Sequence, residues 1–595
     1  MLRSLPGRNE RLPFRVEGFA TLVEGLEYAA RGETGFGFHD GRGRLVTVLA
    51  YAELAERARD LAGRLLATGL ARGDRVAMVA DTTPEFVVLF FACQYAGLVP
   101  VPLPLPVNLG GREAYIARLA AMMRAAGAAL AVATDDFRPM LAEAARRAAV
   151  RATLAPAEIA ALAPRGRPVP FGPDEPCYIQ YSSGSTRMPR GVLVDQRALV
   201  ANARAIARDG LRLRPGDRCV SWLPLYHDMG LVGCCLTPTL AQIPVDYLAP
   251  TAFARRPLLW IELLARYRAT ISYAPTFGYE LAARRAERAG GVERFDLSAW
   301  RVAGLGGEMI RPAVLERFAR VFRPAGFDPR AFLASYGLAE ATLAVTMARP
   351  GEGLRCDLVR RDETLERARL AVPARVGDAV PVRDFVRCGR PLAGYRVEIR
   401  DERGRPLPER HVGRVCVAGP SLMRGYFRDP AASARAFEPD GLLDTGDLGY
   451  LVDGELVVTG RAKDLIIVGG RNIWPQDLEW AVERLPEVRA GDVAAFAVAG
   501  GEDREEVVVV VVECRLADPA ARARLRREVR GTVARTAGID CRVALVPPRS
   551  LAYTTSGKLS RAAVRARWLR GELVDLDDAA PVRPEAVPAR EVEAA

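Results

Sequence analysis

Patterns typical of helices and of buried strands alternate from residue 51 to about residue 340. Apolar residues recur at helical spacing from Tyr51 to Leu65, and the apolar run RVAMVA that follows predicts a buried strand. A second helix is expected from Pro84 to Gly97, followed by the strand-like LVPVPL. Because strands that alternate with helices form parallel sheets, the sequence predicts an α/β architecture with mostly parallel sheets.

The pattern changes in the last third of the chain. Between residues 401 and 450, short strands with glycine turns are expected, GRVCVAG being one example. After residue 464 we predict a smaller α+β unit, with a helix over 475–485 and strands over 492–498 and 507–512. The last 20 residues are rich in proline, alanine and charge, which predicts a flexible tail.

Charge and composition exclude several classes of protein. The net charge is +12, but the arginines are spread along the chain and no basic run with interleaved aromatics occurs, so nucleic acid is not an expected partner. The apolar stretch 86–107 contains four closely spaced prolines, which favours a buried helix and strand over a transmembrane segment. No signal peptide is visible, and the ten cysteines form no CxxC pair. The sequence predicts a reduced, cytoplasmic, monomeric protein.

Lysine is almost absent from this basic chain. Of its 84 basic residues 82 are arginine, and the two lysines are Lys463, in GRAKDLI, and Lys558, in TTSGKLS. A lysine offers a compact point charge on a flexible stem, whereas arginine offers a planar fork. The two lysines are therefore expected at positions where arginine will not serve.

The segment YSSGSTRMPRG, residues 181–191, combines five hydroxyls with two glycines and ends in arginines. Its backbone amides from Ser183 to Thr186 could form an anion-binding nest. It follows a strand-like CYIQY, but the GxxxxGK[ST] spacing of a Walker P-loop is absent. Taken alone, such a loop could equally be only a turn.

Four further motifs accompany this loop: YGLAEAT at 336–342, DTGDLGY at 444–450, GRAKDLIIVGGRNIWPQDLE at 460–479 and TSGKLSR at 555–561. Together the five resemble the core motifs of the adenylate-forming superfamily, which includes acyl-CoA synthetases, luciferases and the adenylation domains of peptide synthetases. The resemblance covers roughly residues 10 to 570. It implies a large N-terminal domain of α/β subdomains plus a β-barrel, hinged to a small α+β C-terminal domain.

Finer features resemble the fatty acyl-AMP ligases of that superfamily. Arg187 stands where most members have glycine, and LPLYHDMGLVG at 223–233 and SYGLAEATLA at 335–344 are typical of these ligases. The stretch from Leu343 to Cys388 fits the insertion that sets them apart from acyl-CoA ligases and is thought to hinder the arrangement that accepts CoA. The segment VAGLGGEMIRP departs from the usual family pattern, although its glycines and Glu308 survive.

The resemblance implies ATP and Mg²⁺ as cofactors and the formation of an acyl-AMP anhydride with loss of pyrophosphate. Two anions must approach each other in that step, so the site needs positive charge and a metal. Glu340 resembles the Mg²⁺ ligand, Tyr336 the residue that stacks on adenine, and Asp447 and Arg461 the ribose-binding pair. The nucleotide-binding residues carried over are Ser182, Ser183, Gly184, Ser185, Thr186, Gly306, Gly307, Glu308, Ser335, Tyr336, Gly337, Leu338, Ala339, Asp447 and Arg461.

The remaining expected roles concern the fatty acid and the reaction. Lys558 is expected to bridge the carboxylate and the α-phosphate, and His227 to orient the carboxylate; with Glu340 they form the expected catalytic set. Lys463 is expected to be the hinge residue. The predicted substrate-binding residues are His227, Gly230, Gly233, Phe277 and Tyr279, although glycines in an apolar helix can also serve close packing.

The resulting hypothesis is a fatty acyl-AMP ligase that passes a medium- or long-chain acyl group to an acyl carrier protein acting in trans. A fatty acyl-CoA ligase and a non-catalytic acyl-adenylate binding module stay open as alternatives. A serine hydrolase is excluded because no GxSxG elbow occurs. The expected domains are a core at 1–460 with the insertion at about 343–388, a hinge at 461–464, a mobile C-terminal domain at 465–575 and a flexible tail at 576–595.

Overall fold

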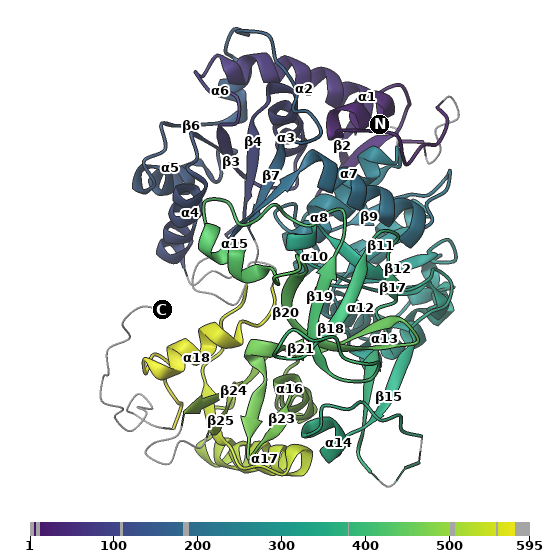
Figure 1. Ribbon diagram of the computed structural model, residues 1–595, viewed down its shortest axis with the longest axis vertical. Helices are drawn as coiled ribbons and strands as arrows, with labels where there is room; N and C mark the ends of the chain where they lie inside the picture. Colours follow the sequence, from purple (N-terminus) through teal and green to yellow (C-terminus); the bar gives the residue numbers. More distant parts are fainter. Residues whose placement is uncertain are drawn as a thin grey trace.

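A nine-stranded, mainly parallel sheet forms the centre of the large domain (Figure 1). In this computed structural model the described residues are 5–6, 12–106, 111–181, 190–375, 377–378, 380–499, 506–554 and 557–577. The strand order is β17-β14-β13-β12-β11-β9-β10-β1-β2, and only the pairings at its edges, β1–β2, β13–β14 and β14–β17, are antiparallel. The strands are β1 (Gly35–His39), β2 (Leu45–Ala50), β9 (Cys219–Ser221), β10 (Val245–Leu248), β11 (Ile271–Ala274), β12 (Val302–Leu305), β13 (Phe332–Gly337), β14 (Ala344–Met347) and β17 (Arg390–Pro391).

A second sheet has the order β4-β3-β5-β6 and is parallel throughout. Its strands are β3 (Arg75–Val79), β4 (Val99–Leu103), β5 (Leu130–Val132) and β6 (Ala152–Leu154), with helices α2 (Tyr51–Leu66), α3 (Pro84–Ala96), α4 (Arg112–Ala126), α5 (Arg138–Arg147) and α6 (Pro156–Ala160). Helix α3 begins where Thr83 accepts a hydrogen bond from the Phe86 amide, and ends at Gly97, whose φ of 65° favours glycine. The predicted alternation of buried helix and strand is confirmed here.

Other helices cover the sheets or connect their strands. They are α1 (Leu22–Ala29), α7 (Gln196–Arg204), α8 (Asp228–Leu231), α9 (Thr237–Leu240), α10 (Pro250–Arg255), α11 (Leu258–Arg266), α12 (Thr276–Ala289), α13 (Pro312–Phe322) and α15 (Pro430–Ala436). Strands β7 (Pro176–Tyr181) and β8 (Gly191–Asp195) form an antiparallel pair on either side of the phosphate-loop motif, whose residues 182–189 lie outside the described residues. Among the helices of the described residues, none is both long and apolar enough to span a bilayer.

The β-rich part expected as a barrel is a four-stranded antiparallel sheet of β18 (Arg396–Arg400), β19 (Gly413–Ala418), β20 (Leu443–Val452) and β21 (Glu455–Arg461). The insertion before it contains the antiparallel pair β15 (Cys356–Arg360) and β16 (Val382–Val386), with the single-turn helix α14 (Glu363–Glu366) between them. These strands pack through a shared hydrophobic cluster that includes Phe385, Tyr450 and Trp474.

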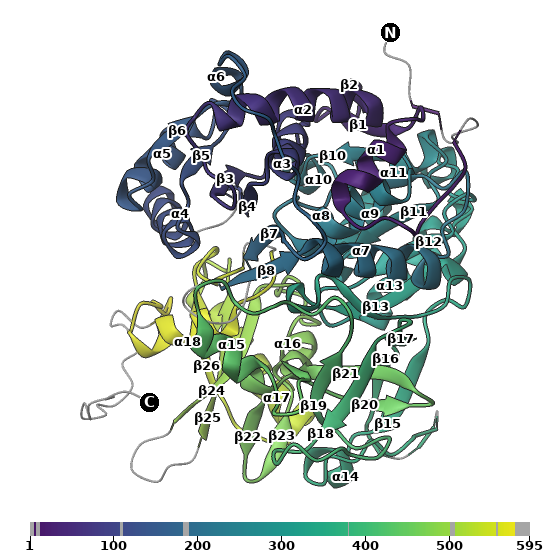
Figure 2. The same ribbon diagram turned by 45° about the horizontal axis from the view of Figure 1, so that its top comes forward.

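The C-terminal part folds around its own core, because two hydrophobic clusters contain only residues from 466 onward. It consists of β22 (Ile466–Val468), β23 (Arg471–Ile473), α16 (Pro475–Val482), β24 (Val493–Ala499), β25 (Glu506–Glu513), α17 (Pro519–Ala537), β26 (Arg542–Val546) and α18 (Arg561–Leu569). In both Figure 1 and Figure 2 these elements gather at the lower end of the molecule, away from β3–β6. The predicted fold class is confirmed; residues 578–595 of the expected tail lie outside the described residues.

Candidate active site

A cavity of about 740 Å³ lies where the large domain meets the C-terminal part. The loops after β12 and β13, the start of α8, the ends of β20 and β21, and the turn before α18 all contribute to its wall. Residues from all of the motifs in the described chain therefore meet in one place. The predicted site residues that line it are His227, Gly233, Phe277, Gly306, Gly307, Glu308, Ser335, Tyr336, Gly337, Leu338, Ala339, Glu340, Asp447, Arg461, Lys463 and Lys558.

Tyr336, Asp447 and Arg461 form one group on the cavity wall, joined by a hydrogen bond and an ion pair. The Tyr336 hydroxyl donates to Asp447 Oδ2 at 2.7 Å, and Arg461 Nε lies 3.5 Å from Asp447 Oδ1. Antiparallel pairing of β20 with β21 places Asp447 opposite Arg461, which explains why two separate motifs meet. Burial raises the pKa of Asp447, while Arg461 opposes the shift. The group presents a flat aromatic ring and a carboxylate that can accept from neighbouring hydroxyls.

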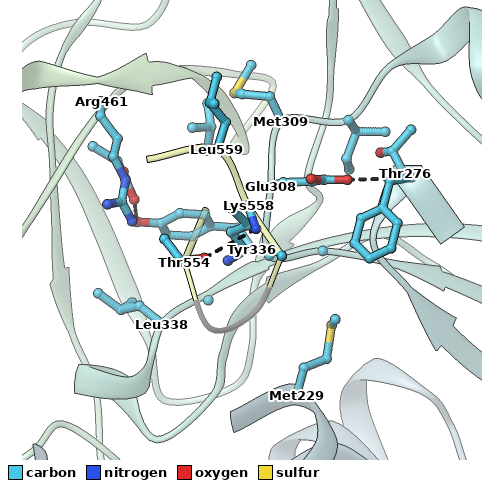
Figure 3. Close-up of a pocket in the computed structure, with 18 of the residues that line it drawn as sticks. Met229, Thr276, Glu308, Met309, Tyr336, Leu338, Arg461, Thr554, Lys558 and Leu559 are labelled. Atoms are coloured by element: carbon cyan, nitrogen blue, oxygen red, sulfur yellow. Dashed lines mark hydrogen bonds and ion pairs between the residues drawn. The ribbon is translucent and has the colours of Figure 1, made fainter. Parts of the chain in front are cut away.

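Lys558 projects from the turn before α18 into the cavity (Figure 3). The turn is closed by a hydrogen bond from the Thr554 amide to the Lys558 carbonyl at 2.7 Å. A methyl group added at Gly307 would lie 3.5 Å from Lys558 Nζ, and Gly307 has a φ of 82° that favours glycine. Burial lowers the pKa of Lys558, and Asp228, Glu308 and Asp447 act in the opposite direction. The ammonium group thus lies in the cavity within electrostatic reach of three carboxylates.

His227 marks the start of α8. Its Nδ1 lies 2.7 Å from Asp228 Oδ1, and both side chains line the cavity. Burial favours the neutral form of Asp228, but His227 and Lys558 outweigh burial and lower the pKa of this carboxyl. Sequence reasoning missed Asp228, although its position next to His227 in YHDMG was a usable signal.

Glu340 lies in the short 3₁₀ turn Ala339–Ala341, and its Oε1 accepts a hydrogen bond from the Tyr426 hydroxyl at 2.9 Å. The Arg190 guanidinium lies 5.1 Å from the centre of the Tyr426 ring. Burial raises the pKa of Glu340, and the Tyr426 bond opposes the shift. A carboxylate oxygen in this position suits Mg²⁺. In the described part of the chain no group of three or more His, Cys, Asp or Glu is arranged to hold a metal ion. Sequence reasoning missed Tyr426, which belongs to none of the motifs.

Three predicted residues make structural contacts in addition to, or in place of, the predicted roles. Glu308 lines the cavity and also holds the start of α12, because its Oε1 accepts from the Phe277 amide at 3.1 Å. Tyr279 lies in an aromatic cluster with Trp260, Trp300 and Phe318, and its hydroxyl donates to the Gly304 carbonyl at 3.0 Å. A methyl group at Gly230 would lie 2.2 Å from the Pro224 carbonyl oxygen, so this glycine allows close packing. The predicted Ser182, Ser183, Gly184, Ser185 and Thr186 lie outside the described residues.

Comparison with known proteins places these features in one family. Residues 42–427 match the family model described as AMP-binding enzyme. A protein of Caulobacter vibrioides whose name assigns it provisionally to the acyl-CoA synthetases is 50% identical, over 94% of this chain and 97% of its own. The medium-chain-fatty-acid–[acyl-carrier-protein] ligase JamA of Moorena producens is 32% identical, over 93% and 96% of the two chains.

A solved structure from a study of fatty acyl-adenylate ligases of E. coli and L. pneumophila superposes with a TM-score of 0.89 and 44% identity. The match covers 94% of this chain and 100% of that one. The two proteins are therefore similar in sequence as well as in fold, along nearly the whole of this chain. The chain belongs to the AMP-binding enzyme family and is an adenylate-forming ligase.

Proposed function

We propose that the protein activates a medium- or long-chain fatty acid with ATP to fatty acyl-AMP and transfers the acyl group to the phosphopantetheine thiol of an acyl carrier protein. The observation that carries this proposal is the single cavity in which Tyr336, Asp447 and Lys558 meet an apolar wall containing Leu343 and Met347. A nucleotide and an acyl chain can therefore be bound side by side. A monomeric state and a cytoplasmic location stay predictions.

The chemistry requires a carboxylate oxygen to bond to the α-phosphorus while the bond to the bridging oxygen of pyrophosphate breaks. Negative charge increases on the α-phosphoryl oxygens during this step, and a positioned cation stabilises it. Lys558, which projects into the cavity, combines a flexible stem with a point charge. We assign it to the α-phosphate and carboxylate, and we assign His227 to orienting the carboxylate.

We propose that Glu340 holds Mg²⁺ together with phosphate oxygens of ATP. The bound ion would neutralise phosphate charge, and the Tyr426 hydroxyl fixes the orientation of the Glu340 carboxylate.

Glu340→Gln removes the charged ligand while keeping the shape of the side chain. We expect the Mg²⁺ concentration that gives half-maximal ATP–pyrophosphate exchange to rise at least about tenfold. A Mg²⁺ titration of the exchange reaction measures this, with the exposed Glu352→Gln as the matched control. A requirement within twofold of wild type would remove Glu340 from the metal site.

Contacts between the insertion and the C-terminal part support a carrier protein as acceptor. Glu366 of α14 pairs with Arg471 at 2.6 Å, and its carbonyl accepts from Asn472 Nδ2 at 2.7 Å. Arg383 of β16 lies 2.9 Å from Asp477 of α16. These contacts join the proposed mobile domain, 465–575, to the insertion of the proposed core, 1–460. They therefore connect the two domains at points other than the proposed hinge at 461–464. We infer that they hinder the arrangement of the two domains that would accept free CoA.

The experiment is to supply wild-type enzyme, ATP and a fatty acid with either free CoA or a holo carrier protein. We expect acyl-AMP to accumulate without acceptor, acyl transfer to the carrier, and little acyl-CoA. Rapid, stoichiometric formation of acyl-CoA would instead establish the fatty acyl-CoA ligase, the alternative that the name of the Caulobacter relative favours. Absence of pyrophosphate release with every acid would establish a non-catalytic binding module.

A further inference from the structure

The cavity has an apolar arm that leads away from the nucleotide end. We use this name for the wall formed by Ile206, Leu211, Gly233, Cys234, Tyr273, Leu343, Ala344 and Met347. Most of these side chains belong to, or pack against, one hydrophobic cluster of the large domain. Ser335 of β13 lines the same cavity and pairs in the sheet with Met347, a residue of the arm. Its composition suits a hydrocarbon chain.

Two π-helical turns contribute to the arm: Ala205–Gly210, which follows α7, and Val232–Leu236, which follows α8. Such turns are rare and occur often at functional sites, because the extra residue displaces the helix wall. In the second turn, a methyl group at Gly233 would lie 3.2 Å from Leu343 Cδ2. Both turns therefore contribute to the shape of the arm.

Met347 lies directly on the first of these turns. A methyl group added at Gly210 would be 2.3 Å from Met347 Sδ and 3.1 Å from its Cε, so the thioether packs against the glycine backbone. Met347 is only 6% exposed although it lines the cavity. Its side chain thus fills the space between Gly210 and the arm.

The backbone of Met347 is held on both sides. In the sheet Met347 pairs with Ser335 of β13 and with Arg390 of β17. At the start of the same strand, the Asn202 side chain donates to the Ala344 carbonyl at 2.8 Å and accepts from its amide at 3.1 Å. A change in the space available at Gly210 must therefore be absorbed by the flexible Met347 side chain.

We propose that Met347, seated on Gly210, bounds the apolar arm and limits the length of the acyl chain that the enzyme activates. The inference rests on the proposed function, since it concerns the fatty acid substrate. Each further methylene of the acid that is buried in the arm favours binding by about fourfold. Removing the Met347 side chain, or pushing it into the arm, should therefore shift the optimal acid length measurably.

The test is ATP–pyrophosphate exchange with straight-chain acids from C4 to C18, measured as kcat/KM. Met347→Ala removes the three terminal heavy atoms and should move the optimum to acids two to three carbons longer, with a gain of about tenfold for an acid two carbons beyond the wild-type optimum. Gly210→Ala should push Met347 into the arm and lower kcat/KM at the wild-type optimum by about tenfold, while shorter acids keep their rates. In the double variant the effect of Gly210→Ala should vanish, because the displaced side chain is gone.

Leu392→Ala is the matched control. Leu392 is buried in the same cluster and contacts the Gly210 position at 3.4 Å, but it does not contribute to the cavity wall. It should leave the length profile unchanged. An unchanged profile in both single variants, an equal shift in Leu392→Ala, or a double variant that keeps the Gly210→Ala effect would each overturn the assignment. Failure of the wild-type protein to exchange with any acid would instead overturn the proposed function.

Discussion

Lys558→Ala should lower the rate of acyl-AMP formation by about a hundred- to a thousandfold. Removal of one preorganised donor from a charge-stabilising site typically costs about 3–4 kcal/mol of transition-state stabilisation. The structure provides the preorganisation: the turn closed by Thr554 fixes the backbone, and the ammonium group lies beside Gly307 in the cavity. No other lysine is present to replace it except Lys463 at the proposed hinge.

The experiment compares the two half-reactions. Exchange between ATP and pyrophosphate reports adenylation, and acyl transfer from pre-made acyl-AMP to the carrier protein reports the second step, which Lys558→Ala should affect much less. Lys558→Arg should restore little adenylation, because a planar guanidinium fork cannot place its charge at the single point that the ammonium group occupies. Equal loss in both half-reactions, or near-complete rescue by arginine, would contradict the role assigned to Lys558.

Arg383→Ala should weaken the attachment of the C-terminal domain by about 3–5 kcal/mol, the usual cost of leaving a buried charge unpaired. Arg383 and Asp477 have side chains only 8% and 9% exposed, and the guanidinium lies 4.2 Å from the Phe385 ring centre and 5.0 Å from that of Trp474. Burial raises the pKa of Asp477 and lowers that of Arg383, and each partner offsets the effect on the other. Loss of either partner alone therefore leaves a charge without compensation.

We expect faster hydrogen exchange in α16 and β23 of Arg383→Ala, together with a rise in acyl-CoA formed when CoA is the acceptor. The double variant Arg383→Ala/Asp477→Ala should be less perturbed than Arg383→Ala, because it removes both charges. Arg367→Ala, an exposed arginine of the same insertion, is the control. If hydrogen exchange in α16 and β23 is as slow in Arg383→Ala as in that control, the ion pair does not hold the C-terminal domain in place.

The sequence was a good guide to the site wherever a residue lies in a long motif. Tyr336, Asp447 and Lys558 come from three distant segments, and all three meet in the cavity. Tyr279 was misleading because its neighbours in sequence do line the cavity, whereas its own side chain points into an aromatic core formed by residues far along the chain. Helical spacing cannot distinguish these two directions without the tertiary packing.

The contacts that the motifs did not predict have a common cause. Tyr426 reaches Glu340 across 86 positions of sequence, and Met347 reaches Gly210 across two elements that no local pattern relates. The alternation of strands and helices could be predicted from apolar periodicity, because that periodicity reflects which side chains within one short segment are buried. Pairings between side chains on separate elements depend on sheet order, which no single segment encodes.

The ion pairs that join the C-terminal domain to the rest of the chain differ in their contact with water. Arg383–Asp477 is enclosed, whereas in Arg471–Glu366 and in Arg311–Glu483, which joins the loop before α13 to the residue after α16, the arginines are about a quarter exposed. Dissolved ions screen exposed charges far more than enclosed ones. Ionic strength should therefore act as a graded control on acceptor choice: rising salt loosens the outer two pairs first, while the enclosed pair keeps the domain from swinging free.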